Sequence, residues 1–127
     1  MELERYDIEE SSDELTYRFY SDGPKGRIRK AVSFQPARHL GRNAYNLLFG
    51  DYVESTGWID DRVVSNNGDP RIILLVVAGI VDKFVNLYPQ AIIFIKGSSA
   101  SRTRLYQMGI TSAWSEIREK YDIWGAR

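Results

Sequence analysis

The sequence has no cysteine, a single histidine and no long apolar run. Without cysteine the chain can form neither disulfides nor a thiolate metal site, so secretion gains no support. With only His39 present, a pair of catalytic histidines is excluded within one chain. The longest apolar run, IILLVVAGIV, ends after ten residues, whereas a membrane-spanning helix needs about 20. We therefore expect this run to be a buried core segment.

The N-terminus opens with MELERYDIEE, which has acidic residues where an export signal needs a basic segment followed by an apolar one. We therefore expect a cytoplasmic protein that does not enter a membrane. The net charge is zero, yet residues 1–14 hold seven acids against one base, and residues 15–127 hold 16 bases against 10 acids. The lead is either a solvated, flexible segment or an acidic segment that shields a basic surface or binds a neighbouring molecule.

Periodicity predicts the remaining organisation. The length of 127 residues with 43% hydrophobic content fits one domain with a proper core, residues 15–127. LTYRFYS alternates and ends in the turn formers SDGPKG, which predicts a hairpin. In the return strand RIRKAVSF, Lys30 falls on the apolar face, so it should lie near a sheet edge or extend its ammonium to solvent. AYNLLFGDY and GWIDDRVV would complete a four-strand meander.

A long helix is expected to begin at Pro70, with Asp69 as its cap, and to end near Tyr88. Apolar residues almost surround its first half, so the sheet and a second element, for example a partner subunit, should cover it. AIIFIK is expected to be a buried strand. A short helix from Arg102 to Met108 should end at Gly109, before a further helix and a last short strand, DIWGA.

These elements predict an α+β fold. A mostly antiparallel sheet, the four-strand meander plus later strands, packs on one long helix and carries a smaller C-terminal helical portion. The expected core combines Trp58, Phe34 and Phe49 with the long helix, notably Ile73, Val77, Ile80 and Phe84.

Four segments carry a family resemblance: YSDGPKGRIRKAV, YNLLFGDY, GWIDDRVVSNNGD and IKGSSASRTRLYQMGI, in this order. Together they resemble a family of small bacterial proteins of unknown function, over about residues 15–125. The resemblance implies a compact α+β domain and a bacterial origin, and it supplies no reaction or catalytic residues. The acidic lead lies outside the resemblance.

One candidate site is the corner where the strand before Gly97 turns into a helix. Backbone amides at a helix start attract phosphate or carboxylate, and nearby cations add to this attraction. The candidate anion-binding residues are Lys96, Gly97, Ser98, Ser99, Ser101, Arg102 and Arg104. The spacing is not that of a phosphate-binding Walker loop. The alternative is a well-formed turn in which a serine caps the helix.

A second candidate is the basic surface of the hairpin and the following loop. Its residues, Arg27, Arg29, Lys30, Arg38 and Arg42, would bind nucleic acid, with Tyr17 or Tyr20 nearby for stacking. The alternative is a solvated strand face.

Catalysis has less support. His39 is a weak candidate for RNA cleavage, because one histidine among arginines could serve as a proton-transfer group. Without a bulge, Asp60 and Asp61 cannot both ligate one magnesium ion with Asp51, since neighbours on a strand point to opposite faces. We therefore expect no metal site and no cofactor, and turn or surface roles for these aspartates.

The sequence favours a non-catalytic binding module for a polyanion, above all nucleic acid. The alternatives are a small ribonuclease-like enzyme and a protein-interaction module that forms a homodimer through apolar surface.

Overall fold

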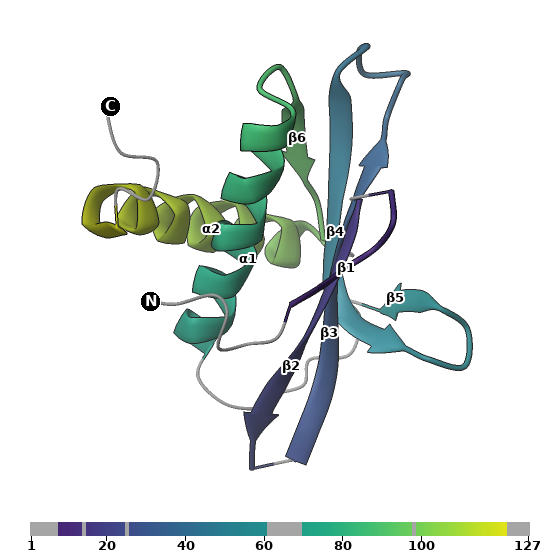
Figure 1. Cartoon of the computed structure of the whole chain (residues 1–127), viewed down its shortest axis with the longest axis vertical. Coiled ribbons are helices and arrows are strands. Elements are labelled where there is room, and N and C mark those ends of the chain that lie inside the picture. The colour runs from purple at the N-terminus through teal and green to yellow at the C-terminus, as the bar shows by residue number, and fades with distance from the viewer. Residues whose placement is uncertain (1–7, 14, 25, 61–69, 98, 122–127) are drawn as a thin grey trace.

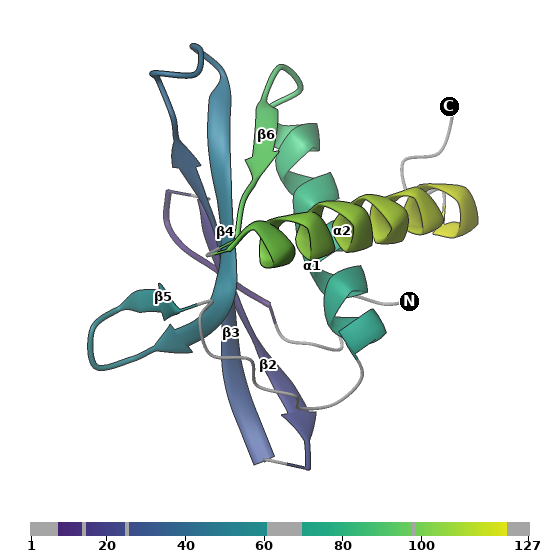
Figure 2. The same ribbon diagram turned by 180° about the vertical axis from the view of Figure 1, so that it is seen from behind.

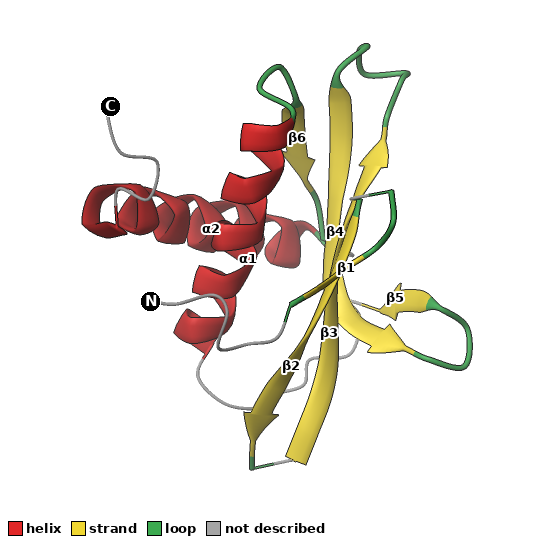
Figure 3. Ribbon diagram, viewed as in Figure 1, coloured by secondary structure: helices red, strands yellow, loops and turns green. Residues whose placement is uncertain are grey.

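The computed structural model describes residues 8–13, 15–24, 26–60, 70–97 and 99–121, and this part of the chain forms one six-stranded sheet and two helices (Figure 3). The elements are β1 (Glu9–Glu10), β2 (Thr16–Gly23), β3 (Gly26–Pro36), β4 (Ala44–Val53), β5 (Trp58–Asp60), α1 (Pro70–Leu87), β6 (Ile92–Ile95) and α2 (Ala100–Tyr121). The predicted α+β class is confirmed.

The first five strands form an antiparallel meander in the order β1-β2-β3-β4-β5. The predicted hairpin joins β2 to β3 with Gly23 opposite Gly26, and Gly26 has φ 90°, a backbone conformation that favours glycine. The meander therefore has one strand more than expected, because the acidic lead contributes β1. Only Trp58–Asp60 of the expected strand GWIDDRVV are seen as β5, and its last four residues lie outside the described part.

One edge of β4 is shared by two strands. Near the C-terminal end of β4, Asp51 is paired with Asp60 of the antiparallel β5. Near its N-terminal end, Ala44 is paired with Ile92 of β6, and this pairing is parallel. The prediction that β6 is a buried strand is wrong, because Ile92 and Phe94 are 58% and 41% exposed. Among the described residues β6 pairs with β4 alone, so it is an edge strand with one covered face.

Helix α1 packs on one face of the sheet, which we call the inner face (Figure 1). Phe34 of β3 stacks on Phe84 of α1 with ring centroids 3.9 Å apart and planes within 8°. Tyr17 and Tyr45 meet this pair edge-on, and Val77 is fully buried beside it. The expected start of the helix at Pro70 is confirmed, and the capping role of Asp69 falls outside the described residues.

The second element that covers α1 is α2, and no partner subunit is needed for this. Leu75 and Ala78 of α1 pack with Ile117 of α2, and Trp114 Nε1 donates a hydrogen bond to the buried Asp82 Oδ1 at 3.0 Å. Helix α2 crosses α1 steeply and extends away from the sheet (Figure 2). The expectation of one long helix is therefore wrong.

The predicted helix end at Gly109 is also wrong, because α2 continues through it. A Cβ at Gly109 would lie 2.8 Å from Leu74 Cδ1, so glycine here allows the two helices to approach closely and does not end a helix. Trp58, expected in the core, is 68% exposed on β5. The strand expected at DIWGA lies outside the described residues. Within the described part, neither helix is long and apolar enough to cross a membrane.

A candidate binding face on the open side of the sheet

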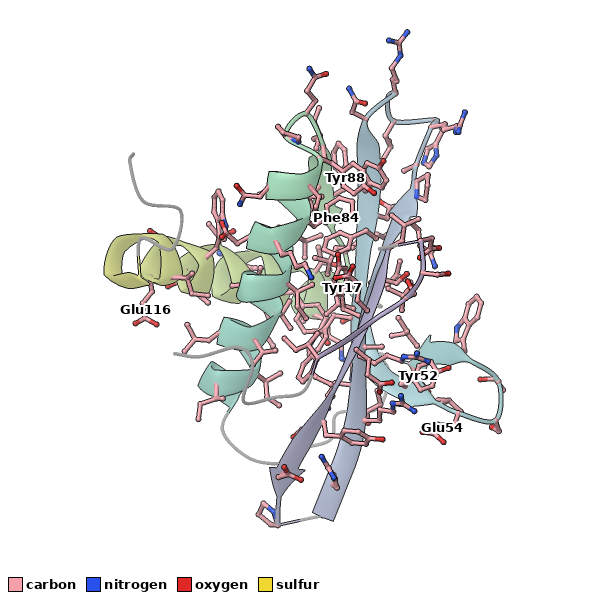
Figure 4. All side chains as sticks on the ribbon, viewed as in Figure 1. Tyr17, Tyr52, Glu54, Phe84, Tyr88 and Glu116 are labelled. Carbon is pink, nitrogen blue, oxygen red and sulfur yellow. The ribbon has the colours of Figure 1, made fainter. Side chains whose placement is uncertain are left out.

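The face of the sheet opposite α1, the outer face, is covered by neither of the two described helices (Figure 1). Strand alternation sends Tyr17 into the core and Tyr20 to the outer face. Figure 4 makes the same contrast with labelled side chains: Tyr17, Phe84 and Tyr88 lie between the sheet and α1, whereas Tyr52 and Glu54 lie by the β4–β5 hairpin on the opposite side. The outer face is thus the open surface on which a binding site can form.

Arginine and tyrosine side chains alternate across this face. Arg27 lies over the Tyr20 ring at 4.2 Å, and Arg29 lies 5.4 Å from the same ring. Arg29 is also 5.3 Å from the Tyr52 ring, which has Arg18 5.3 Å away. We call this series the Arg–Tyr ladder. Each such contact contributes about 0.5–1 kcal/mol at an exposed site, so the ladder holds its planar groups in place.

Register explains why the ladder forms. Tyr20 on β2 is the Cα partner of Arg29 on β3. Ala31 is the partner of Arg18 on one side and of Gly50 on the other. These small residues leave room for long side chains to cross above them, and Ala31 is completely buried. Arg18 Nη1 donates a hydrogen bond across this floor to the Tyr52 hydroxyl at 3.4 Å.

The central arginine of the ladder is held by two carboxylates. Arg29 donates to Glu54 Oε1 at 2.6 Å and to Glu9 of β1. The hydrogen bond that Arg29 donates to Glu54 is the largest cause that raises the pKa of Arg29 above its ordinary value, and Glu9 adds to it. Arg29 Nε is buried and has no hydrogen-bond partner among the described residues. Arg29 is therefore a fixed cation whose charge is balanced from within the chain.

The predicted nucleic-acid-binding residues do not form one surface. Arg27 and Arg29 share the outer face with Tyr20, as strand alternation predicts. Lys30 lies on the inner face, where its ammonium pairs with Asp51 at 2.5 Å and its side chain is 8% exposed. The expectation that Lys30 lies near an edge or extends to solvent is wrong, because β3 is a central strand and Asp51 on β4 is directly opposite.

The other basic residues lie at the far end of β3. Arg38, Arg42 and the candidate His39 are exposed in the β3–β4 loop. β3 has 11 residues, so this loop is roughly 30 Å or more from the β2–β3 hairpin that carries Arg27. No described residue makes a hydrogen bond or an ion pair with the His39 side chain. The loop is therefore a separate basic surface.

The corner before α2 is a capped turn in the described residues. Ser99 Oγ accepts a hydrogen bond from Arg102 N at 3.2 Å. Thr103 Oγ1 accepts from Gly97 N at 2.9 Å and donates to Ser99 O at 2.9 Å. A Cβ on Gly97 would lie 2.7 Å from Arg102 Cβ, so the chain folds tightly against the helix start. These contacts fit the turn alternative.

The candidate anion-binding residues are consequently divided. Lys96 and Gly97 line a pocket on β4, whereas Arg102 belongs to the helix start and Arg104 is exposed on α2. Ser98 is outside the described residues, and Ser101 is exposed in the first turn of α2. Metal binding has no support in the described part of the chain, because no three histidine, cysteine, aspartate or glutamate residues come close enough to hold an ion.

Sequence reasoning missed two of the five ladder residues. Arg18 and Tyr52 were not candidates, since their place beside Arg29 depends on the pairing of β4 with β3. Alternation along LTYRFYS does place Arg18 and Tyr20 on one face, which was the available signal. Glu9 was considered only as part of the acidic lead. Nothing in the sequence indicated that Thr103 would hydrogen-bond with Gly97 and Ser99.

Comparison with known proteins assigns the chain to a family, and the function of that family is unknown. The model of a family described as "Family of unknown function (DUF6934)" matches residues 2–127. The match includes the acidic lead that the resemblance in the sequence had left out. No curated protein and no solved structure gives a significant match.

Proposed function

The chain belongs to this family of unknown function, DUF6934, and we propose that it is a non-catalytic module that binds single-stranded nucleic acid on the outer face of its sheet. The observation that carries the proposal is the Arg–Tyr ladder on a face that no described helix covers. The cysteine-free composition and the family resemblance favour the cytoplasm of a bacterium as its location.

Planar groups are what a sequence-tolerant binder of single strands needs. Stacking of a base on an aromatic side chain is worth about 1–3 kcal/mol, and bases also stack on guanidinium planes. Tyr20 and Tyr52 have guanidinium groups over their rings. The planes open to a ligand are therefore those of the terminal arginines, Arg27 and Arg18, with the tyrosines as their supports.

Carboxylates of the chain pair with two arginines of the ladder, and a nucleic-acid strand would have to compete with them. Arg27 pairs with Asp22, and Arg29 pairs with Glu9 and Glu54. A phosphate that reaches Arg27 or Arg29 must replace a carboxylate, so these contacts exchange one anion for another. We expect modest affinity that falls steeply with salt. Glu9 comes from the acidic lead, and its ion pair with Arg29 supports the proposal that the lead shields a basic surface.

The first test compares two double substitutions that remove equal charge. Native protein should bind a labelled twelve-nucleotide oligo(dT) in fluorescence anisotropy at low salt. Arg18→Ala with Arg27→Ala should weaken binding and lower the salt slope by about 0.7 for each lost phosphate contact. Arg38→Ala with Arg42→Ala, at the far loop, should have little effect.

Equal weakening by both pairs would mean that net charge alone drives binding, and the proposal would then fail. A second comparison uses the neighbouring residues of β1. Glu9→Gln should tighten binding, because Glu9 is the ion-pair partner of Arg29. Glu10→Gln removes the same charge, but Glu10 pairs with Lys83 on α1, so this variant should bind like the native protein. No binding by native protein or by Glu9→Gln at low salt would reject the proposal.

A second candidate function is self-association through apolar surface. Leu105 and Met108 are 61% and 63% exposed on α2, three residues apart and so on one side of the helix. Exposed apolar side chains that lie together on one side of a helix can form a contact between two copies of a chain. Sedimentation equilibrium should give a dimer that Leu105→Glu dissociates, and a native monomer at high concentration would exclude it.

A further inference from the structure

A pocket with a volume of about 310 Å³ lies on β4 between β5 and the end of β6. Its lining comes from three strands and the turn after β6: Gln35, Asn46, Leu47, Leu48, Phe49, Ile59, Lys96 and Gly97. Ligand pockets in proteins usually measure about 300–1,000 Å³, so this one suits a small ligand of about the size of a nucleoside.

Two carboxamides converge at this pocket. Gln35 on β3 and Asn46 on β4 are Cα partners across the ladder, so their side chains share one face. That face is the outer one, because Leu47 beside Asn46 is buried in the core and Phe34 beside Gln35 stacks on α1. Neither carboxamide makes a side-chain hydrogen bond to any described residue. Each offers a carbonyl acceptor and an amino donor within reach of one ligand.

Apolar and cationic groups complete the arrangement. Leu48 of β4 and Ile59 of β5 are both half-buried at the pocket, and they present apolar surface to a flat ligand. Phe94 of β6, 41% exposed, is the Cα partner of Asn46 and therefore stands beside it. Lys96 at the rim is exposed and forms no ion pair with a described residue. The pocket thus combines apolar side chains, two carboxamides and one lysine.

We propose that this pocket binds the adenine base of a nucleotide, with Lys96 on its phosphate. Asparagine and glutamine carboxamides match the N6 donor and N7 acceptor of adenine, a pairing worth about 1–3 kcal/mol of discrimination against a wrong base. The half-buried Leu48 and Ile59 line the pocket and suit the faces of a purine. The inference rests on the proposed function and extends it, because the outer face then reads one base of the strand it holds.

The test measures base preference at a single position. The twelve-nucleotide oligo(dT) is compared with the same strand carrying one central deoxyadenosine, by anisotropy at constant salt. Native protein should bind the adenine-containing strand at least about fivefold more tightly, the lower limit for one matched carboxamide contact. Gln35→Leu and Asn46→Leu should each remove the preference and leave oligo(dT) affinity unchanged.

Gln90→Leu is the matched control, because Gln90 is an exposed carboxamide that lines a different cavity. It should keep the preference. Gln35 is exposed at the end of β3, so its substitution tests the pocket even if Asn46→Leu fails to fold in circular dichroism. Loss of the preference in Gln90→Leu as well would overturn the inference.

Competition with free AMP shows whether the pocket prefers a free nucleotide or an adenine base within a strand. Competition by AMP that is stronger than that of the strand indicates a free nucleotide, and the reverse indicates a base within a strand; both outcomes support the adenine pocket. Equal affinity for the two strands, with no competition by AMP, would overturn the inference and leave the proposed function standing. Binding of neither strand would instead overturn the proposed function itself.

Discussion

The two faces of this sheet carry the same kinds of residue and use them differently. Each has a lysine or arginine held by carboxylates and each has tyrosines. On the inner face, Lys30 pairs with Asp51 among apolar side chains, and Tyr17 is fully buried. On the outer face, Arg29 pairs with Glu9 and Glu54, which are 50% and 66% exposed. The inner pair is shielded from solvent, whereas the carboxylates of the outer pair are accessible to it.

The largest effect on stability should come from placing a charged side chain on the inner face. Val77→Asp places an unpaired carboxylate in an apolar interior, which costs several kcal/mol against a total stability of about 5–15. We expect the variant to lack a cooperative thermal transition in circular dichroism. Leu87→Asp is the control on the same helix, since Leu87 is 44% exposed and should tolerate the charge. A normal melt for Val77→Asp would contradict the assigned core.

Comparison of the two ion pairs gives the next effect. Asp51→Asn leaves the buried Lys30 ammonium without its carboxylate, which should lower the free energy of unfolding by about 3–5 kcal/mol. Glu54→Gln on the outer face should cost at most about 1 kcal/mol, because an exposed ion pair contributes little. Urea denaturation measures both values. Replacing both inner partners, as Lys30→Met with Asp51→Leu, should restore most of the loss.

Equal losses for Asp51→Asn and Glu54→Gln would remove the distinction between the faces. Equal losses would also weaken the binding proposal, because that proposal requires a phosphate to replace the carboxylates of the outer face. Glu54→Gln should behave like Glu9→Gln and tighten oligonucleotide binding, whereas Asp51→Asn should not.

Local signals predicted much of the inner face. Apolar spacing and Pro70 correctly predicted α1, and Phe34 was correctly predicted to face the core. The prediction failed where distant segments meet. Gly109 looked like a helix end, yet glycine there serves the crossing with α1, and no local pattern distinguishes the two roles.

The outer face was predicted only in part for the same reason. Alternation within β3 placed Arg27 and Arg29 on one face. Of the two tyrosines expected nearby, Tyr20 lies beside these arginines and Tyr17 is buried in the core. Tyr52 and the carboxylates of Glu9 and Glu54 reach these residues only because distant strands pair in a particular register. Glu9 and Glu54, which both contact Arg29, are 45 residues apart in the sequence. Burial of Lys30 depended on Asp51 in the same way.

The smallest effect concerns Trp58, the residue for which the sequence was most misleading. A tryptophan followed by isoleucine in a predicted strand favours the core, because aromatic side chains carry much apolar area. In the structure Trp58 begins the three-residue strand β5 and is 68% exposed. Trp58→Ser should therefore change the free energy of unfolding by no more than about 0.5 kcal/mol, the usual range for surface substitutions.

Phe34→Ser gives the matched comparison, because Phe34 is fully buried and stacks on Phe84. Its loss should cost about 3–5 kcal/mol, the usual range for truncating a buried aromatic side chain. If Trp58→Ser were as destabilising as Phe34→Ser, Trp58 would belong to the core after all. If its stability is unchanged while oligonucleotide affinity falls, the tryptophan is a stacking surface for the strand, and the β4–β5 hairpin extends the binding face beyond the Arg–Tyr ladder.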